Sequence, residues 1–101
     1  MARRSTHPGE VLREEFMKPL DLSANALALA LRVPATRIGD ILRTAKPRAV
    51  SADTAIRLAR YFGTSAEFWL NLQSAYDLSL AITEHGPTIE RDVHPREGIA
   101  A

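Results

Sequence analysis

The chain has 101 residues, of which 46% are hydrophobic and none is cysteine, and its formal net charge is +1. This length suits one small domain with a single core, and the apolar content excludes a disordered chain. The absence of cysteine excludes a disulfide scaffold and a thiolate metal site. No apolar run approaches the roughly 18 residues of a membrane span and no signal peptide is recognisable. We therefore expect a cytoplasmic protein without a membrane partner.

The first predicted helix follows a short basic lead-in, residues 1–6, which we expect to be flexible. It begins near Pro8, because proline is favoured at the first position of a helix. It ends at Pro19, because the residue before a proline avoids the helical region. Its apolar stripe consists of Val11, Leu12, Phe16 and Met17.

Two short helices joined by a tight corner are predicted next. Ser23 is a typical N-cap for the first of them, and the corner falls at Arg32 and Val33. Pro34 opens the second helix, which ends near Arg43. The inward-facing positions are Leu27, Ala28, Leu31, Ile38, Ile41 and Leu42. This layout is typical of a helix-turn-helix, whose second helix enters the major groove of DNA.

Positive charge is concentrated on the same segment. Five basic residues and one acidic residue lie between Arg32 and Arg48, a net charge of +4 on 17 residues, while the rest of the chain carries −3. A local basic patch on a nearly neutral protein is suited to phosphate contact. The alternative is an ordinary solvated surface.

The second of these helices is the predicted DNA-reading element, because the N-terminal half of such a helix lies closest to the base edges. The predicted base-reading residues are Ala35, Thr36, Arg37 and Asp40. Arginine suits guanine because its planar fork meets two acceptors at once. Phosphate contacts are predicted for Asn25, Arg43, Lys46 and Arg48. For Asn25 and Asp40, an ordinary surface role is an equal alternative.

A fourth and a fifth helix complete the predicted domain, capped by Ser51 and Ser65. The apolar positions of the fourth are Ala55, Ile56, Leu58, Ala59 and Phe62, and Gly63 follows as a C-cap. In the fifth, Phe68, Leu72 and Ala75 are expected to face the core. Trp69, Tyr76 and Leu80 then remain as a candidate homodimer seam, unless the domain buries them all. From Glu84 the periodicity stops, which predicts a flexible tail over residues 84–101.

Four segments of the chain resemble the HigA-type (VapI-like) antitoxins of the Cro/C1-type (XRE) helix-turn-helix superfamily. They read HPGEVLREEFMKPL, LSANALALAL, VPATRIGDIL and SADTAIRLARYFGTSAEFWLNLQSAYDL, and the resemblance covers residues 7–80. It implies an all-α, five-helix lambda-repressor-like DNA-binding domain over residues 7–83. It also implies two partners for a homodimer. One is double-stranded operator DNA, bound to repress its own operon. The other is a HigB-like ribonuclease toxin of the RelE type, which cuts messenger RNA on the ribosome and which the antitoxin neutralises.

Two departures from the family pattern bear on DNA binding. Arg32 stands where the family usually has glycine, so either the turn is rearranged or a contact offsets the strain of a left-handed arginine. The segment 43–50 is about two residues longer than the usual Asn-Gly turn. These departures leave open a protein-interaction module that no longer binds DNA. A plain Cro/C1-like repressor without a toxin partner is a second alternative, which the adjacent reading frame would distinguish. The toxin docking surface also stays open between the first helix, the lead-in and the tail.

No catalytic constellation is recognisable. The three histidines are His7, His85 and His94, and none has metal-ligand spacing. Glu14 and Glu15 are adjacent, so on a helix they point in different directions and do not form an acid pair. There is no glycine-rich phosphate loop or nucleophile elbow. We expect no enzymatic activity and no cofactor.

Overall fold

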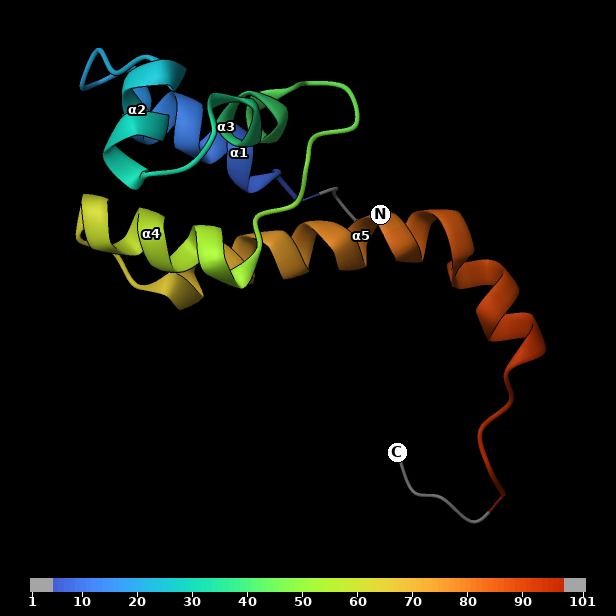
Figure 1. The fold of residues 1–101 in the computed structure, drawn as a ribbon. Coiled ribbons are helices and arrows are strands. Elements are labelled where there is room, and N and C mark those ends of the chain that lie inside the picture. The colour runs from blue at the N-terminus through green and yellow to red at the C-terminus, as the bar shows by residue number, and fades with distance from the viewer. Residues whose placement is uncertain (1–4, 98–101) are drawn as a thin grey trace.

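The computed structural model describes residues 5–97, and all regular structure within them is helical (Figure 1). Five α-helices and one π-helical segment follow one another as predicted for an all-α domain. Helices α1, α2 and α3 form one group, and α4 and α5 lie against it. The bounds are α1 Pro8–Val11, the π-helical segment Leu12–Met17, α2 Ala24–Leu31, α3 Ala35–Leu42, α4 Ala52–Phe62 and α5 Ala66–Asp92.

Three serines cap the helices as the sequence predicts. The hydroxyl oxygens of Ser23, Ser51 and Ser65 each accept the backbone N–H three residues ahead, at 3.0–3.3 Å. His7 caps α1 in a similar way, because its Nδ1 accepts the Gly9 N–H at 2.9 Å. Each cap satisfies a backbone donor that has no partner inside its helix.

The first helical stretch ends next to Pro19 as predicted, but for a different reason. Lys18 keeps helical angles, with φ −60° and ψ −49°, so the restriction on the residue before proline does not end it. Instead Asp21 adopts a left-handed conformation, with φ 51°, and the Leu22 N–H bonds the Met17 carbonyl at 2.9 Å. This is the hydrogen-bond pattern of a Schellman motif, which closes a helix C-terminus.

A single core fills the space between the helices, and Trp69 lies fully buried within it. Its indole ring is 5.1 Å from the Phe16 ring, and its Nε1–H donates to Thr64 Oγ1 at 2.8 Å. Trp69 is therefore not part of a homodimer seam, and that prediction was wrong. The remaining buried hydrophobic residues are Leu12, Met17, Leu27, Ala28, Leu31, Ile38, Ile41, Val50, Ala55 and Leu58.

The buried face of α5 is shifted from the predicted one. Trp69 and Gln73 are buried, whereas Phe68 is 37% exposed and Ala75 is exposed. Leu72 packs partly against the core as expected. The other seam candidates, Tyr76 and Leu80, are half-buried. Besides Phe68, the exposed large apolar residues of α5 are Leu78, Ile82 and Ile89. On α4, Ile56 is also exposed, although it was predicted to face the core.

Helix α5 continues beyond its predicted end. It runs to Asp92 with Pro87 inside it, so residues 84–92 are helical where a flexible tail was predicted. Proline removes one backbone hydrogen bond and bends a helix, but in an exposed helix it need not end it. The helix bends in its last third and projects away from the body, giving a molecule of 54 × 25 × 23 Å (Figure 1). Residues 1–4 of the predicted lead-in and 98–101 of the predicted tail lie outside the described residues.

No helix within residues 5–97 is both long enough and apolar enough to cross a membrane.

Candidate nucleic-acid interface

The corner between α2 and α3 keeps the left-handed geometry that glycine favours, although arginine occupies it. Arg32 has φ 60° and ψ 44°. The Val33 N–H donates to the Ala28 carbonyl at 3.0 Å, and the Arg32 N–H donates to the Leu29 carbonyl at 3.2 Å. These two bonds form a Schellman motif that satisfies the carbonyls at the end of α2. The corner therefore keeps a left-handed residue at Arg32, and α3 begins three residues later at Ala35.

Helix α3 buries one face and presents the other to solvent. Ile38 and Ile41 are fully or almost fully buried, while Ala35 and Thr36 are exposed. Pro34 is the N-cap and not the first helical residue, and Arg43 is the C-cap, so the helix is one residue shorter at each end than predicted. The predicted reading face is nonetheless on the outside of the domain.

Arg37 is less free than a surface arginine, because α4 holds it. Its Nη1 donates to Asp53 Oδ2 at 2.7 Å, and 27% of its side chain is exposed. The same carboxylate oxygen accepts from Arg57 Nε at 2.9 Å, and Arg57 Nη1 donates to the Leu31 carbonyl at 2.8 Å. Hydrogen bonds from Arg57 first and Arg37 second hold the pKa of the Asp53 carboxyl below its ordinary value. A continuous chain of polar contacts thus joins α2, α4 and α3.

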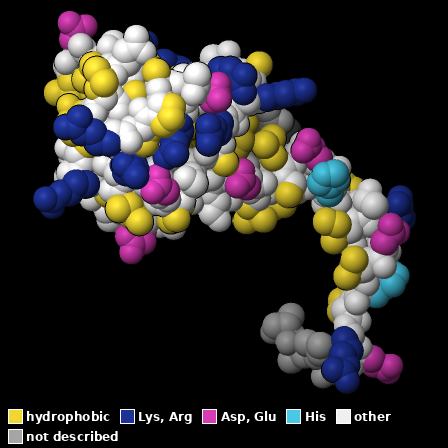
Figure 2. Space-filling model, viewed as in Figure 1, with side chains coloured by type: hydrophobic (Ala, Val, Ile, Leu, Met, Phe, Trp, Pro, Cys, Tyr) yellow, Lys and Arg dark blue, Asp and Glu magenta, His cyan; other side chains and the backbone are white. Residues whose placement is uncertain are grey.

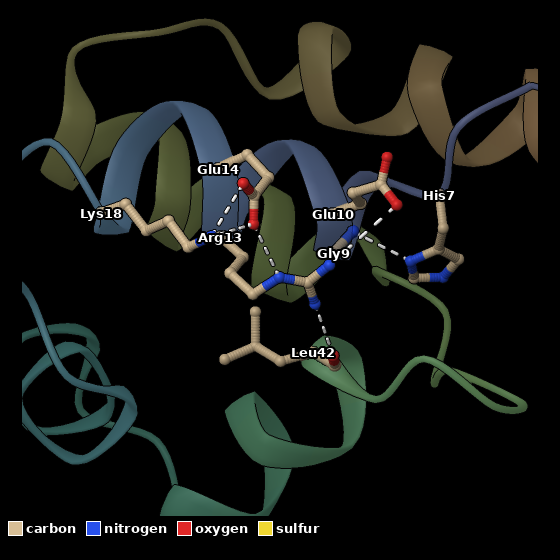
Figure 3. Close-up of polar contacts among 7 residues, drawn as sticks. All are labelled: His7, Gly9, Glu10, Arg13, Glu14, Lys18 and Leu42. Carbon is tan, nitrogen blue, oxygen red and sulfur yellow. Dashed lines mark hydrogen bonds and ion pairs between the residues drawn. The ribbon is translucent and has the colours of Figure 1, made fainter.

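The opposite end of α3 is held by α1 and by the π-helical segment that follows it (Figure 3). Arg13 Nη1 donates to the Leu42 carbonyl at 3.0 Å, which satisfies an acceptor in the last turn of α3. Gly9 packs against the same end, where any Cβ atom would overlap the Ile41 carbonyl oxygen. The Arg13 guanidinium also pairs with Glu14 at 3.0 Å. Helix α3 is therefore fixed near its N-terminal end by α4, and at its C-terminal end by α1 and the π-helical segment.

The long segment 43–50 closes back onto α3. The Asp40 carbonyl accepts the N–H of Arg48 at 2.9 Å and that of Arg43 at 3.4 Å. The Asp40 carboxylate lies 4.0 Å from the Arg43 guanidinium and 3.9 Å from that of Arg48. At the far end, the Val50 N–H donates to the buried Gln73 Oε1 at 2.8 Å. These contacts order the segment, and Lys46 occupies its exposed turn in a left-handed conformation with φ 49°.

The structure brings some of the predicted residues together and leaves others apart. Asp40 joins Arg43 and Arg48, whereas Arg37 pairs with α4, and Asn25 is exposed near the start of α2. Figure 2 shows Lys and Arg side chains spread over the helical body with acidic side chains among them. Sequence reasoning missed the residues that fix α3, which are Gly9, Arg13, Asp53 and Arg57. The four-residue spacing of Asp53 and Arg57 was a readable signal for their pair, but nothing local pointed to Arg37 as its third member.

Known proteins with this arrangement identify the family. A family model described as helix-turn-helix matches residues 14–69. Virulence-associated protein I of Dichelobacter nodosus is 59% identical over 75 residues, which cover 74% of this chain and 68% of that protein. Pseudomonas aeruginosa antitoxin HigA, solved with the higBA promoter, is 52% identical with a TM-score of 0.87, over 92% of this chain and 99% of that one. Antitoxin GraA, solved in complex with its operator, is 46% identical with a TM-score of 0.88, over 100% and 97%. The chain therefore belongs to the helix-turn-helix family, and within it to the HigA-type (VapI-like) antitoxins.

Proposed function

We propose that this chain is the antitoxin of a type II toxin–antitoxin system, which represses its own operon through α3 and neutralises a HigB-like, mRNA-cleaving toxin. The observation that carries the DNA-binding half is the outward display of α3, fixed at both ends and followed by a basic segment. The solved HigA and GraA structures hold a promoter and an operator, respectively, which supports the same role here.

Two sets of residues divide the work in this proposal. Base edges are met by Ala35, Thr36, Arg37 and Asp40, and phosphates by Asn25, Arg43, Lys46 and Arg48. The arginine at the corner had raised the alternative of a module that no longer binds DNA. Because Arg32 keeps the left-handed conformation, this residue gives no reason to expect a displaced α3.

The DNA-binding half is tested with a duplex from the chain's own promoter and a scrambled duplex of equal length. Wild-type protein is expected to prefer the promoter and to bind more weakly as salt rises, since phosphate contacts release counterions. Arg37→Ala is expected to reduce the preference for the promoter, and Lys46→Ala to weaken binding evenly on both duplexes. Equal binding to both duplexes by the wild type would contradict operator recognition.

The toxin half is tested by co-expression with the small reading frame next to this one. Rescue of growth, together with a complex that survives pull-down, is the expected result. Failure of both, with intact operator binding, would leave the plain Cro/C1-like repressor as the function.

We further propose that the protein acts as a homodimer, so that two copies of α3 meet a palindromic operator about one helical turn apart. The exposed residues Leu78, Ile82 and Ile89 supply an apolar face along α5. Of the three residues predicted for the homodimer seam, Trp69 is buried in the core, whereas Tyr76 and Leu80 are half-buried.

A further inference from the structure

Asp53 occupies an unusual place for an acidic residue in a DNA-binding surface. It lies in the first turn of α4, with 56% of its side chain exposed, and it contacts the predicted base reader of α3. A carboxylate next to DNA opposes binding by charge alone. The hydrogen bonds of Asp53 with Arg37 and Arg57 suggest a role that compensates for this repulsion.

The contacts form an ordered chain in which each member fixes the next. Arg57 is anchored to the Leu31 carbonyl at 2.8 Å and donates through Nε to Asp53 Oδ2 at 2.9 Å. Asp53 Oδ2 in turn accepts from Arg37 Nη1 at 2.7 Å. Leu31 is the last residue of α2. These contacts therefore fix the Arg37 side chain relative to α2 as well as to its own helix.

The geometry leaves Arg37 able to read a base. A guanidinium carries five N–H donors, and Asp53 engages one of them, at Nη1. The donors on Nε and Nη2 form the fork that fits the O6 and N7 acceptors of guanine. An arginine held at one nitrogen loses less side-chain entropy when the other two bind.

From this series of contacts we infer that Asp53 is a positioning residue for operator recognition. It holds Arg37 so that the donors on Nε and Nη2 meet one guanine of the operator. The inference rests on the proposed DNA-binding function and deepens it. Arg57 serves as the support for Asp53, and the predicted ligand of the clamped arginine is a guanine and not a phosphate.

The test is a double-mutant cycle on promoter and scrambled duplexes, with unfolding curves confirming that every variant is folded at the assay temperature. Asp53→Asn is expected to lower the ratio of promoter to scrambled affinity about tenfold, near the worth of one bidentate base contact. In the Arg37→Ala background, the same change is expected to alter that ratio less than about twofold, because the residue that Asp53 positions is absent. Asp53→Glu, which keeps the carboxylate, is expected to recover part of the ratio.

A matched control separates positioning from simple charge. Glu67 lies in the first turn of α5, which is capped by a serine as α4 is, so Glu67→Gln removes the same charge away from Arg37. It is expected to leave the affinity ratio unchanged. An equal effect of Asp53→Asn on both duplexes would show that Arg37 meets a phosphate and would overturn the inference, as would an undiminished effect in the Arg37→Ala background. If the wild type bound promoter and scrambled duplexes equally, the proposed function itself would be refuted.

Discussion

At the scale of single residues, the corner of the helix-turn-helix is held by an arginine in a conformation that suits glycine. Left-handed backbone brings the Cβ atom of an L-residue close to the carbonyl oxygen, and Arg32 accepts that cost at φ 60°. Gly63 shows the unstrained counterpart after α4, at φ 74°. The two positions end neighbouring helices with similar geometry, so they provide a direct comparison.

Replacing Arg32 with glycine is expected to raise the free energy of unfolding by about 1 kcal/mol, because the left-handed strain is removed. Urea unfolding monitored by circular dichroism measures the change. Arg32→Ala is the control for charge, since it keeps the Cβ atom and should give little gain. A gain with alanine equal to that with glycine would show that the charge, and not the conformation, is unfavourable.

His7 is a buried histidine whose protonation affects the stability of the fold. It is 8% exposed, its ring meets the Tyr76 ring edge-on at 4.8 Å, and its Nδ1 caps α1. Burial lowers the pKa of His7 below its ordinary value of 6.5, against smaller opposing effects of Asp77 and the Arg48 backbone. The folded state therefore favours the neutral ring, in which Nδ1 can accept a hydrogen bond.

We expect stability to fall in mildly acidic solution because of this residue. Below about pH 6.5 the unfolded chain binds a proton that native His7 resists, so the free energy of unfolding decreases as the pH falls through the lower native pKa. Above pH 6.5 the contribution is fully present. Urea unfolding between pH 5 and 8 measures how steeply the free energy of unfolding changes with pH. His7→Asn keeps a capping oxygen and should make this dependence less steep. An identical slope in both variants would assign it to other groups.

At the scale of helices, the sequence predicted what is decided locally. Ser23, Ser51 and Ser65 cap α2, α4 and α5 because the N-cap interaction involves residues three apart in the chain. The predicted buried face of α5 was wrong by about one residue. Phe68 and Trp69 are adjacent aromatic residues, and only the shape of the core decides which of them is buried. The effect of Pro87 likewise depends on whether neighbours oppose a bend, which sequence does not show.

The outward position of Ala35 and Thr36 on α3 was predicted correctly, because the apolar period of this helix is clear. Its fixation was not predictable, because Arg13 and Asp53 reach it from segments far away in the chain. Position in three dimensions, and not residue type, gives these side chains their role. The same holds for Gly9, whose importance appears only once the Ile41 carbonyl is placed against it.

Two glycines on packed helices are expected to respond to alanine in opposite directions. Gly9→Ala should lower the free energy of unfolding by about 2 kcal/mol, because the new methyl group overlaps backbone at the contact of α1 with α3. Gly39→Ala on α3 should raise it by up to about 1 kcal/mol, because no atom outside its chain neighbours and its own helix backbone lies within 4 Å of the added Cβ, and alanine favours a helix. Thermal unfolding measures both. A stabilising Gly9→Ala would contradict the close approach of the two helices.

At the scale of the whole molecule, the projecting part of α5 makes the protein much longer than its core requires. The long axis is 54 Å against 25 and 23 Å for the others, and residues beyond Leu80 contribute no buried side chain within the described part. A single-chain fold gives little reason for exposing Leu78, Ile82 and Ile89 along one helix. A second copy of the chain, as proposed above, would bury them.

Ile82→Glu is accordingly expected to shift the protein from dimer to monomer and to weaken operator binding at least about tenfold, because one copy of α3 would bind a half-site alone. Sedimentation velocity measures the oligomeric state, and the promoter duplex measures the affinity. Ile56→Glu is the matched control, since Ile56 is 61% exposed on α4 and Ile82 is 52% exposed on α5. A monomer produced by Ile56→Glu, with Ile82→Glu still dimeric, would move the dimer contact from α5 to the surface of α4.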